Sequence, residues 1–118
     1  MPSPTTPSPG QPVRCSTTGR PLMAALDLLG RRWSLRVLWE LRGGGLGPRA
    51  LLARCEGLSS SVLYDRLREL TDAGLIRRDR VEAYALTPIG RSLGAALDPL
   101  DDWARQWGRS RTRARSAA

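Results

Sequence analysis

Residues 57–80 carry the sequence GLSSSVLYDRLRELTDAGLIRRDR, and this stretch decides the fold. Ser59 is a favourable N-cap, because its hydroxyl can accept a hydrogen bond from an unpaired amide of the first helical turn. Leu58 and Leu63 flank that cap at the spacing of a hydrophobic staple. Gly74 can adopt the left-handed conformation that ends a helix. The stretch therefore predicts a turn, a serine-capped helix and then a basic strand.

The predicted helix has an apolar face and a polar face. Leu63, Leu67 and Leu70 repeat at helical spacing and form one stripe that should be buried. The order of turn, capped helix and basic strand is typical of a helix that enters a DNA groove with a β-wing beside it. We therefore predict DNA contacts along the beginning and outer face of this helix, by Ser59, Ser60, Ser61, Tyr64, Asp65, Arg66 and Arg68.

Asp65 is the unusual member of this set, because a carboxylate repels phosphate. It can accept a hydrogen bond from a cytosine amino group, or it can pair with Arg68 one turn later. We favour the pair. The basic strand that follows is expected to form the wing, and strand alternation places Arg78 and Arg80 on one face and Arg77 on the other. These arginines either clamp phosphates or protect an exposed strand edge by charge, and we favour phosphate contacts.

The composition agrees with a polyanionic partner. The chain has 118 residues and a formal net charge of +8, and all of its positive side chains are arginines. Arginine binds phosphate in a bidentate manner and reads guanine edges, which favours double-stranded DNA as the partner. A solvated basic surface, or the arginine bias of a GC-rich genome, is the alternative explanation.

Several function classes lack their required residues. The chain has no histidine, and its two cysteines make neither a disulfide framework nor a zinc site, so we expect no metal and no cofactor. The triple glycine at residues 43–45 lacks the Lys-Ser or Lys-Thr of a phosphate-binding loop. We see no catalytic residues and expect no enzyme. No apolar run reaches membrane-spanning length and no secretory signal is visible, so we expect no membrane partner and a cytoplasmic location.

The rest of the chain reads as an arm, four further helical segments and a hairpin. Residues 1–19 are rich in Pro, Ser, Thr and Gly and are expected to form a disordered arm. Prolines at first-turn positions predict helices that begin at Pro21, Pro48 and Pro88, with Thr87 as the N-cap of the last. We expect helices at 21–29, 33–42 and 48–54 and strands at 75–80 and 82–86. A last helical region begins at 88 and has a kink or restart at Asp98, before Pro99. A basic disordered tail is expected at 109–118.

One apolar stripe is longer than a domain of this size needs for its own core. It comprises Leu93, Leu97, Leu100, Trp103 and Trp107, and we expect it to pack across a two-fold axis together with Leu22 and Leu26 of the first helix. The predicted fold class is mainly α with a small β-hairpin, a winged helix-turn-helix that forms a dimer through its terminal helices.

Read together, residues 20–108 resemble the HxlR family of winged helix-turn-helix transcription regulators. The resemblance rests on an ordered set of motifs: LDLLGRRWSL at 26–35, GLS at 57–59, RLREL at 66–70, GLI at 74–76 and YALTPIGRSL at 84–93. It implies a homodimer that binds operator DNA and regulates nearby genes, often in response to redox signals or reactive electrophiles. The residues themselves identify no small-molecule effector.

The chain departs from the family pattern in three places. Many members carry Cys-Pro before the first helix, where this chain has Arg20-Pro21, and Cys15 lies five residues earlier. We therefore expect no thiol switch at Cys15. The wing is shorter than usual, and Leu46-Gly47-Pro48 replaces an arginine-aromatic stretch that forms a short strand, so we expect that strand to be missing. Cys55 is expected to be a small buried thiol that behaves as a hydrophobic residue.

Two hypotheses of different class follow from the sequence. The leading one is a sequence-specific DNA-binding transcription regulator that acts as a homodimer. The alternative is a winged-helix module that docks another protein through the same face and uses its arginines only for solubility. A third, weaker option is a non-specific architectural binder of nucleic acid. Binding to DNA that weakens steeply with salt separates the first hypothesis from the second.

Overall fold

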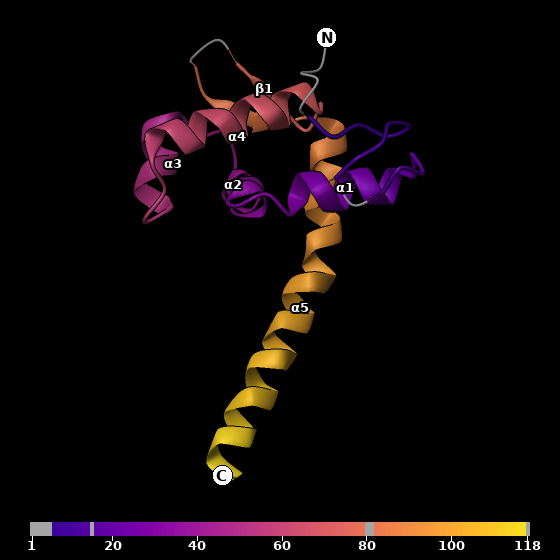
Figure 1. The fold of residues 1–118 in the computed structure, drawn as a ribbon. Coiled ribbons are helices and arrows are strands. Elements are labelled where there is room, and N and C mark those ends of the chain that lie inside the picture. Colours follow the sequence, from indigo (N-terminus) through magenta and orange to yellow (C-terminus); the bar gives the residue numbers. More distant parts are fainter. Residues whose placement is uncertain (1–5, 15, 80–81, 118) are drawn as a thin grey trace.

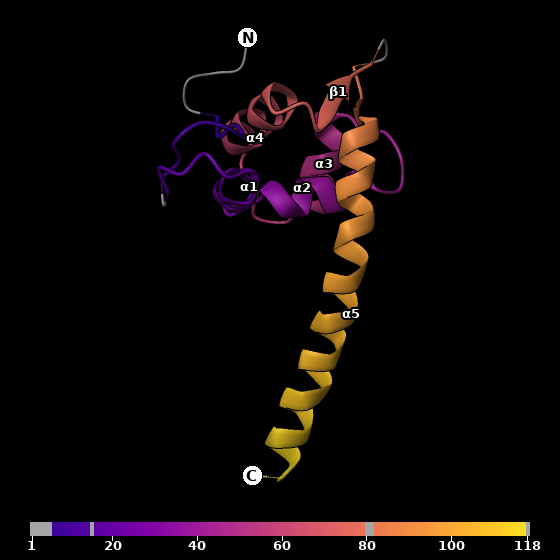
Figure 2. The same ribbon diagram turned by 90° about the vertical axis from the view of Figure 1, so that its right-hand side faces the viewer.

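The computed structural model describes residues 6–14, 16–79 and 82–117. Four short helices and a hairpin form a globular unit, and a long last helix projects away from it, so that the C-terminus lies far from the hairpin (Figures 1 and 2). This mainly helical fold with a two-stranded antiparallel hairpin confirms the predicted fold class. The elements are α1 (Pro21–Leu29), α2 (Ser34–Leu41), α3 (Pro48–Arg54), α4 (Ser60–Asp72), β1 (Ile76–Arg78), β2 (Tyr84–Leu86) and α5 (Pro88–Ala117).

The helices begin where their capping residues predict. The Ser59 hydroxyl accepts from the Val62 amide at 3.3 Å, and the Thr87 hydroxyl accepts from the Gly90 amide at 3.1 Å. Proline occupies the first turns of α1 and α3. After α4, Gly74 adopts a φ of +79°, which confirms the left-handed stop.

The core lies between α2, α3, α4 and the hairpin. The three leucines predicted as the buried stripe of α4 are each 1% exposed or less, and Cys55 is fully buried beside them. The other large side chains that are almost completely buried come from the neighbouring elements: Leu38, Leu41, Leu51 and Ile76. The α4 helix is therefore held by one face, and its opposite face is left to solvent.

The hairpin is short and pairs Ile76 with Leu86 and Arg78 with Tyr84 in antiparallel register. A third segment contributes a single β-bridge, in which the amide of Leu46 donates to the Tyr84 carbonyl at 3.0 Å and the Tyr84 amide donates back at 2.8 Å. The strand expected to be missing is thus reduced to one bridge, which ties the glycine-rich connection to the base of the wing.

The beginning of α5 is fixed to the end of α4 by close backbone contacts. The Thr87 amide donates to the Leu75 carbonyl at 3.0 Å, and its hydroxyl donates to the Gly74 carbonyl at 2.6 Å. A Cβ atom at Gly90 would collide with the Leu75 carbonyl, so only glycine permits this approach.

The structure corrects two expectations about the last helix, namely the restart at Asp98, which was the alternative to a kink there, and the disordered tail. No restart occurs at Asp98, because α5 continues through Pro99. Pro99 leaves the carbonyl of Ala95 without its helical donor, but both residues are exposed, so water can replace the lost bond. Residues 109–117, expected as a disordered tail, form the last turns of α5, and their arginines and alanines have high helix propensity. The domain boundaries at residues 19 and 108 stay predictions.

The described part of the arm folds back onto the helices, which differs from the disorder that we expected. Thr6 and Pro7 are buried, and the Thr6 hydroxyl donates to the Asp72 carboxylate at the end of α4 at 3.4 Å. The Gly10 amide donates to the Gly19 carbonyl at 2.8 Å and closes the segment as a loop. Prolines lower the entropy that such a segment loses when it becomes ordered.

A buried ion-pair cluster connects α4 to the junction between α1 and α2. Glu69 accepts from Arg31 and from Arg66, and the three side chains are 7%, 9% and 18% exposed, respectively. An arginine that follows a helix-ending glycine, as Arg31 follows Gly30, is expected to be exposed; here it is nearly buried, because its guanidinium satisfies a carboxylate that is buried on α4. A buried carboxylate requires such partners.

We predict that Glu69→Ala destabilises the fold by about 3–5 kcal/mol, because it removes the buried carboxylate that Arg31 and Arg66 share. Urea unfolding followed by circular dichroism measures this loss. Asp65→Ala is the matched control, since it breaks an exposed pair on the same helix and should cost about 0–1 kcal/mol. Equal losses in the two variants would contradict the importance of the buried cluster.

Candidate nucleic-acid interface

The α3 and α4 helices form a helix-turn-helix, and its second helix presents a polar surface. The connecting turn is closed by the Leu58 amide, which donates to the Cys55 carbonyl at 3.0 Å, and by Gly57 at a φ of +91°. The turn leads directly into the Ser59 cap. The predicted contact residues that are exposed on this surface are Ser59, Ser60, Ser61, Tyr64 and Arg68. Small hydroxyl side chains leave the first-turn amides of α4 open to a phosphate.

Asp65 and Arg68 pair with each other on the outer face of α4. The Arg68 Nη1 donates to the Asp65 Oδ1 at 3.3 Å, and about half of each side chain is exposed. The geometry is the pair that we favoured for Asp65. An exposed pair of this kind is weak, so Arg68 can exchange its partner for a DNA group at little cost.

Arg66 lies apart from the other predicted contact residues. Its side chain is 18% exposed and pairs with buried Glu69 rather than extending from the outer face. The structure therefore brings six of the seven predicted α4 residues to one surface and directs Arg66 into the ion-pair cluster. The helical period was the available sequence signal, because Arg66 lies three residues after Leu63 and four before Leu70 and so flanks the buried stripe, whereas Arg68 lies opposite it.

The wing places two exposed arginines next to this surface. Arg77 and Arg78 are exposed on β1, and Arg78 pairs with Glu82 at 2.9 Å. Asp79 closes the hairpin, because its amide donates to the Ala83 carbonyl at 2.8 Å and its carboxylate accepts from the Ala83 amide at 3.1 Å. Arg80 lies outside the described residues, so the predicted alternation of Arg78 and Arg80 stays a prediction.

Arg36 braces the helix that precedes the turn, a role that the sequence analysis missed. Its Nε donates to Glu40 at 2.8 Å, and its Nη2 donates to the Arg54 carbonyl at the end of α3 at 2.7 Å. The hydrogen bond to Glu40 raises the pKa of Arg36 above its ordinary value. The four-residue spacing of Arg36 and Glu40 was the available sequence signal.

Cys55 ends α3 inside the core, as predicted. It is a free thiol with no exposed surface. Burial raises the pKa of the Cys55 thiol, the nearby Arg36 guanidinium lowers it in part, and Glu40 raises it further. A thiol of this kind is protonated at neutral pH and has packing as its role.

The predicted dimer surface is largely exposed on the single chain. Leu22, Leu26, Leu100, Trp103 and Trp107 are between 48% and 63% exposed. The two tryptophan rings stack on each other, with centroids 5.6 Å apart. Leu93 and Leu97 differ from these residues, because Leu93 packs against the core cluster and Leu97 is buried.

In the described part of the chain, no group of three or more acidic or cysteine side chains is placed to hold a metal ion. Within the same residues, no helix is both long enough and apolar enough to cross a membrane.

A family profile described as HxlR-like helix-turn-helix matches residues 28–112. The chain is 33% identical over 90 residues to a Bacillus subtilis protein named uncharacterized HTH-type transcriptional regulator YvaP, which covers 70% of this chain and 82% of that protein. It is 36% identical over 102 residues to the similarly named sll1512 of Synechocystis, with coverage of 79% and 75%.

Two solved structures share the fold. The quinone-bound YodB of Bacillus subtilis superposes with a TM-score of 0.67 at 28% identity and covers 72% of this chain and 94% of YodB. A protein of Thermoplasma volcanium, described as a possible HxlR family transcriptional factor, superposes with a TM-score of 0.65 at 28% identity, with coverage of 72% and 82%.

We predict that Cys55 makes the stability of the fold depend on alkaline pH. Because the folded-state pKa is raised, this contribution is fully present below the unfolded-state pKa of about 8.5 and is lost as the pH rises through the folded-state pKa. Urea unfolding between about pH 7 and pH 10 should show the decline in a Cys15→Ser protein. The same decline in a Cys15→Ser, Cys55→Ala protein would assign it to other groups.

Proposed function

Because the chain belongs to the HxlR-like helix-turn-helix family, we propose that it is a sequence-specific transcription regulator that binds operator DNA as a homodimer. The observation that carries this proposal is the exposed, serine-capped beginning of α4, which is anchored by a fully buried leucine face. A helix held in this way is rigid enough to enter the major groove with its N-terminal residues toward the bases.

Within the proposal, the residues of α4 divide into two roles. Ser60, Ser61, Tyr64 and Arg68 contact bases or phosphates, since they are exposed on the outer face. Arg66 is a positioning residue, because its guanidinium holds the Glu69 carboxylate, which also pairs with Arg31 at the α1–α2 junction. Contacts that position a protein on DNA and contacts that read the bases are separable by their dependence on sequence.

The wing adds phosphate contacts from Arg77 and Arg78. Arg78 is tied to Glu82 by an exposed pair, which a phosphate can replace because arginine binds it in a bidentate manner. The hairpin is short, so its contacts are expected along the backbone beside the major groove. Such contacts carry no sequence information.

The alternative, a module that docks another protein through α4, uses the same exposed residues. The net charge of +8 favours DNA over this alternative. Binding of the full chain to DNA from its own genome, measured at several salt concentrations, decides between them. A regulator that neutralises several phosphates loses affinity steeply with salt, whereas a protein-docking module shows no DNA binding to lose.

We predict that Arg68→Ala and Ser61→Ala each weaken binding to the specific site by roughly 1–3 kcal/mol, with a smaller effect on random DNA. The reason is that both side chains project from the outer face of α4. Fluorescence anisotropy with specific and random duplexes measures the difference.

Arg78→Ala with Arg80→Ala is the comparison. This double variant should lower the affinity for both duplexes evenly and reduce the salt slope by about one unit per lost contact. Equal losses on both duplexes for Arg68→Ala would reassign that residue to phosphate.

We also predict that Trp103→Ala with Trp107→Ala gives a monomer that binds DNA far more weakly. The exposed stacked tryptophans form an apolar patch of the kind that marks an interface. A two-fold axis there would set two α4 helices roughly 34–36 Å apart, one DNA turn, and the monomer loses the effective concentration of the second half-site. Sedimentation at micromolar concentration is the test, and a double variant that stays dimeric would exclude this interface.

A further inference from the structure

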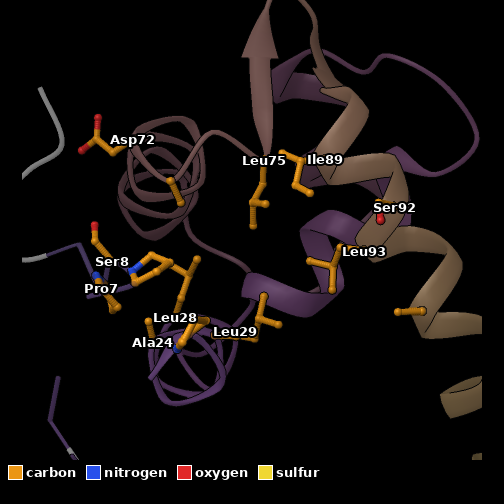
Figure 3. A pocket seen from close by; sticks show the side chains of 15 residues that line it. Pro7, Ser8, Ala24, Leu28, Leu29, Asp72, Leu75, Ile89, Ser92 and Leu93 are labelled. Carbon is orange, nitrogen blue, oxygen red and sulfur yellow. The ribbon is translucent and has the colours of Figure 1, made fainter. Parts of the chain in front are cut away.

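A cavity of about 520 Å³ lies between α1, the end of α4 and the beginning of α5. Figure 3 shows Ala24, Leu28 and Leu29 of α1 on one side and Leu75, Ile89 and Leu93 on the other. Pro7 and Ser8 of the folded-back arm lie over a third side, next to Asp72. The cavity is within the size range of small-molecule sites in proteins.

The lining of this cavity is chemically selective. Most of the residues that line it are aliphatic, and its polar residues are Ser8, Asp72 and Ser92. Although the chain has 19 cationic side chains, none is among the described residues that line the cavity. Anionic ligands therefore find no counter-charge in the described lining, so they are disfavoured.

We propose that this cavity binds a small, neutral, predominantly apolar organic molecule. Its apolar body packs on the α1 and α5 side chains, and a hydroxyl or amide on it hydrogen-bonds to the polar groups at the arm. Binding is non-covalent, because no thiol lines the described part of the cavity. That the molecule acts as an effector of DNA binding rests on the function proposed above.

The position of the cavity gives such a ligand a means to act on α4. Asp72 and Ala73 belong to the end of α4, and Leu75 is the residue whose carbonyl receives the Thr87 amide at the start of α5. A ligand that fills the space between α1 and α5 contacts this junction directly. The ligand therefore favours one spacing of α5 relative to α4. Because it binds the two spacings with different affinity, it shifts the population of the protein toward the spacing that it binds more tightly.

A second copy of the chain is a less suitable occupant. Ala24 and Leu28 line the cavity, whereas the exposed Leu22 and Leu26 are not among its lining residues and are left for a partner. An entering helix, about 10–12 Å wide with its side chains, would also displace Pro7, which is buried over the cavity. The arm closes the cavity to a helix but leaves room for a small molecule.

The test uses the full chain and the neutral dye N-phenyl-1-naphthylamine, which fluoresces in apolar surroundings. We expect one dye per chain, displaced by no anion. Ala25→Phe should fill the cavity from α1 and weaken dye binding at least about tenfold, equivalent to about 1.4 kcal/mol. Ala96→Phe fills the cavity from α5, where Ala96 is exposed, and should weaken dye binding by a similar factor. Ala114→Phe, an exposed position outside the cavity, is the matched control and should bind the dye normally.

Three outcomes would overturn the proposal. The first is that the folded protein binds no dye, or that both filled variants bind it as tightly as the control. The second is that Trp103→Ala abolishes binding, which would place the dye on the exposed tryptophans. The third is that binding disappears as the protein dimerises, which would make a second copy the occupant. Because dye binding is read without DNA, a failure of the proposed DNA-binding function leaves this result intact.

Discussion

The carboxylate of Glu69 is the constraint on which the exposed outer face of α4 depends. It lies buried on α4, and its charge is balanced by Arg31 from the α1–α2 junction and Arg66 from its own helix. Because a buried carboxylate without its partners is costly, the rotation of α4 that brings Glu69 to Arg31 is favoured together with the burial of its leucine face. That rotation turns the leucine face inward and leaves Ser61 and Arg68 outside. Buried charge and exposed contact surface are thus two results of one geometry.

The helix beginnings were predictable because local chemistry fixes them. Ser59 and Thr87 satisfy first-turn amides with their own hydroxyls, and Pro48 has no amide to satisfy. These signals act within four residues and need no knowledge of the fold. The same holds for the apolar face of α4, since its period of leucines is visible in the sequence and its burial follows from the helix.

The features that were missed all depend on distant parts of the chain. Arg31 reads as a surface charge because its partner lies 38 positions away. The folded-back arm reads as disordered because its composition is poor in apolar residues, and the surface that receives it is formed by α1 and α4 together. Pro99 reads as a helix break, although an exposed helix tolerates it. The cavity is formed by residues of several elements, so no sequence motif predicts it.

The absence of a side chain at Gly90 lets the start of α5 make a close backbone contact that fixes its position. The backbone of Gly90 lies against the carbonyl of Leu75, so the helix is fixed at this point and the rest of α5 extends away from it. Trp103 lies thirteen residues further along, about 20 Å at 1.5 Å per residue. A tilt of about 5° at this contact moves Trp103 by nearly 2 Å, which is the size of the helix shifts that occur at subunit interfaces. A single larger residue at position 90 would therefore move the exposed tryptophans of α5 without changing any residue on the outer face of α4.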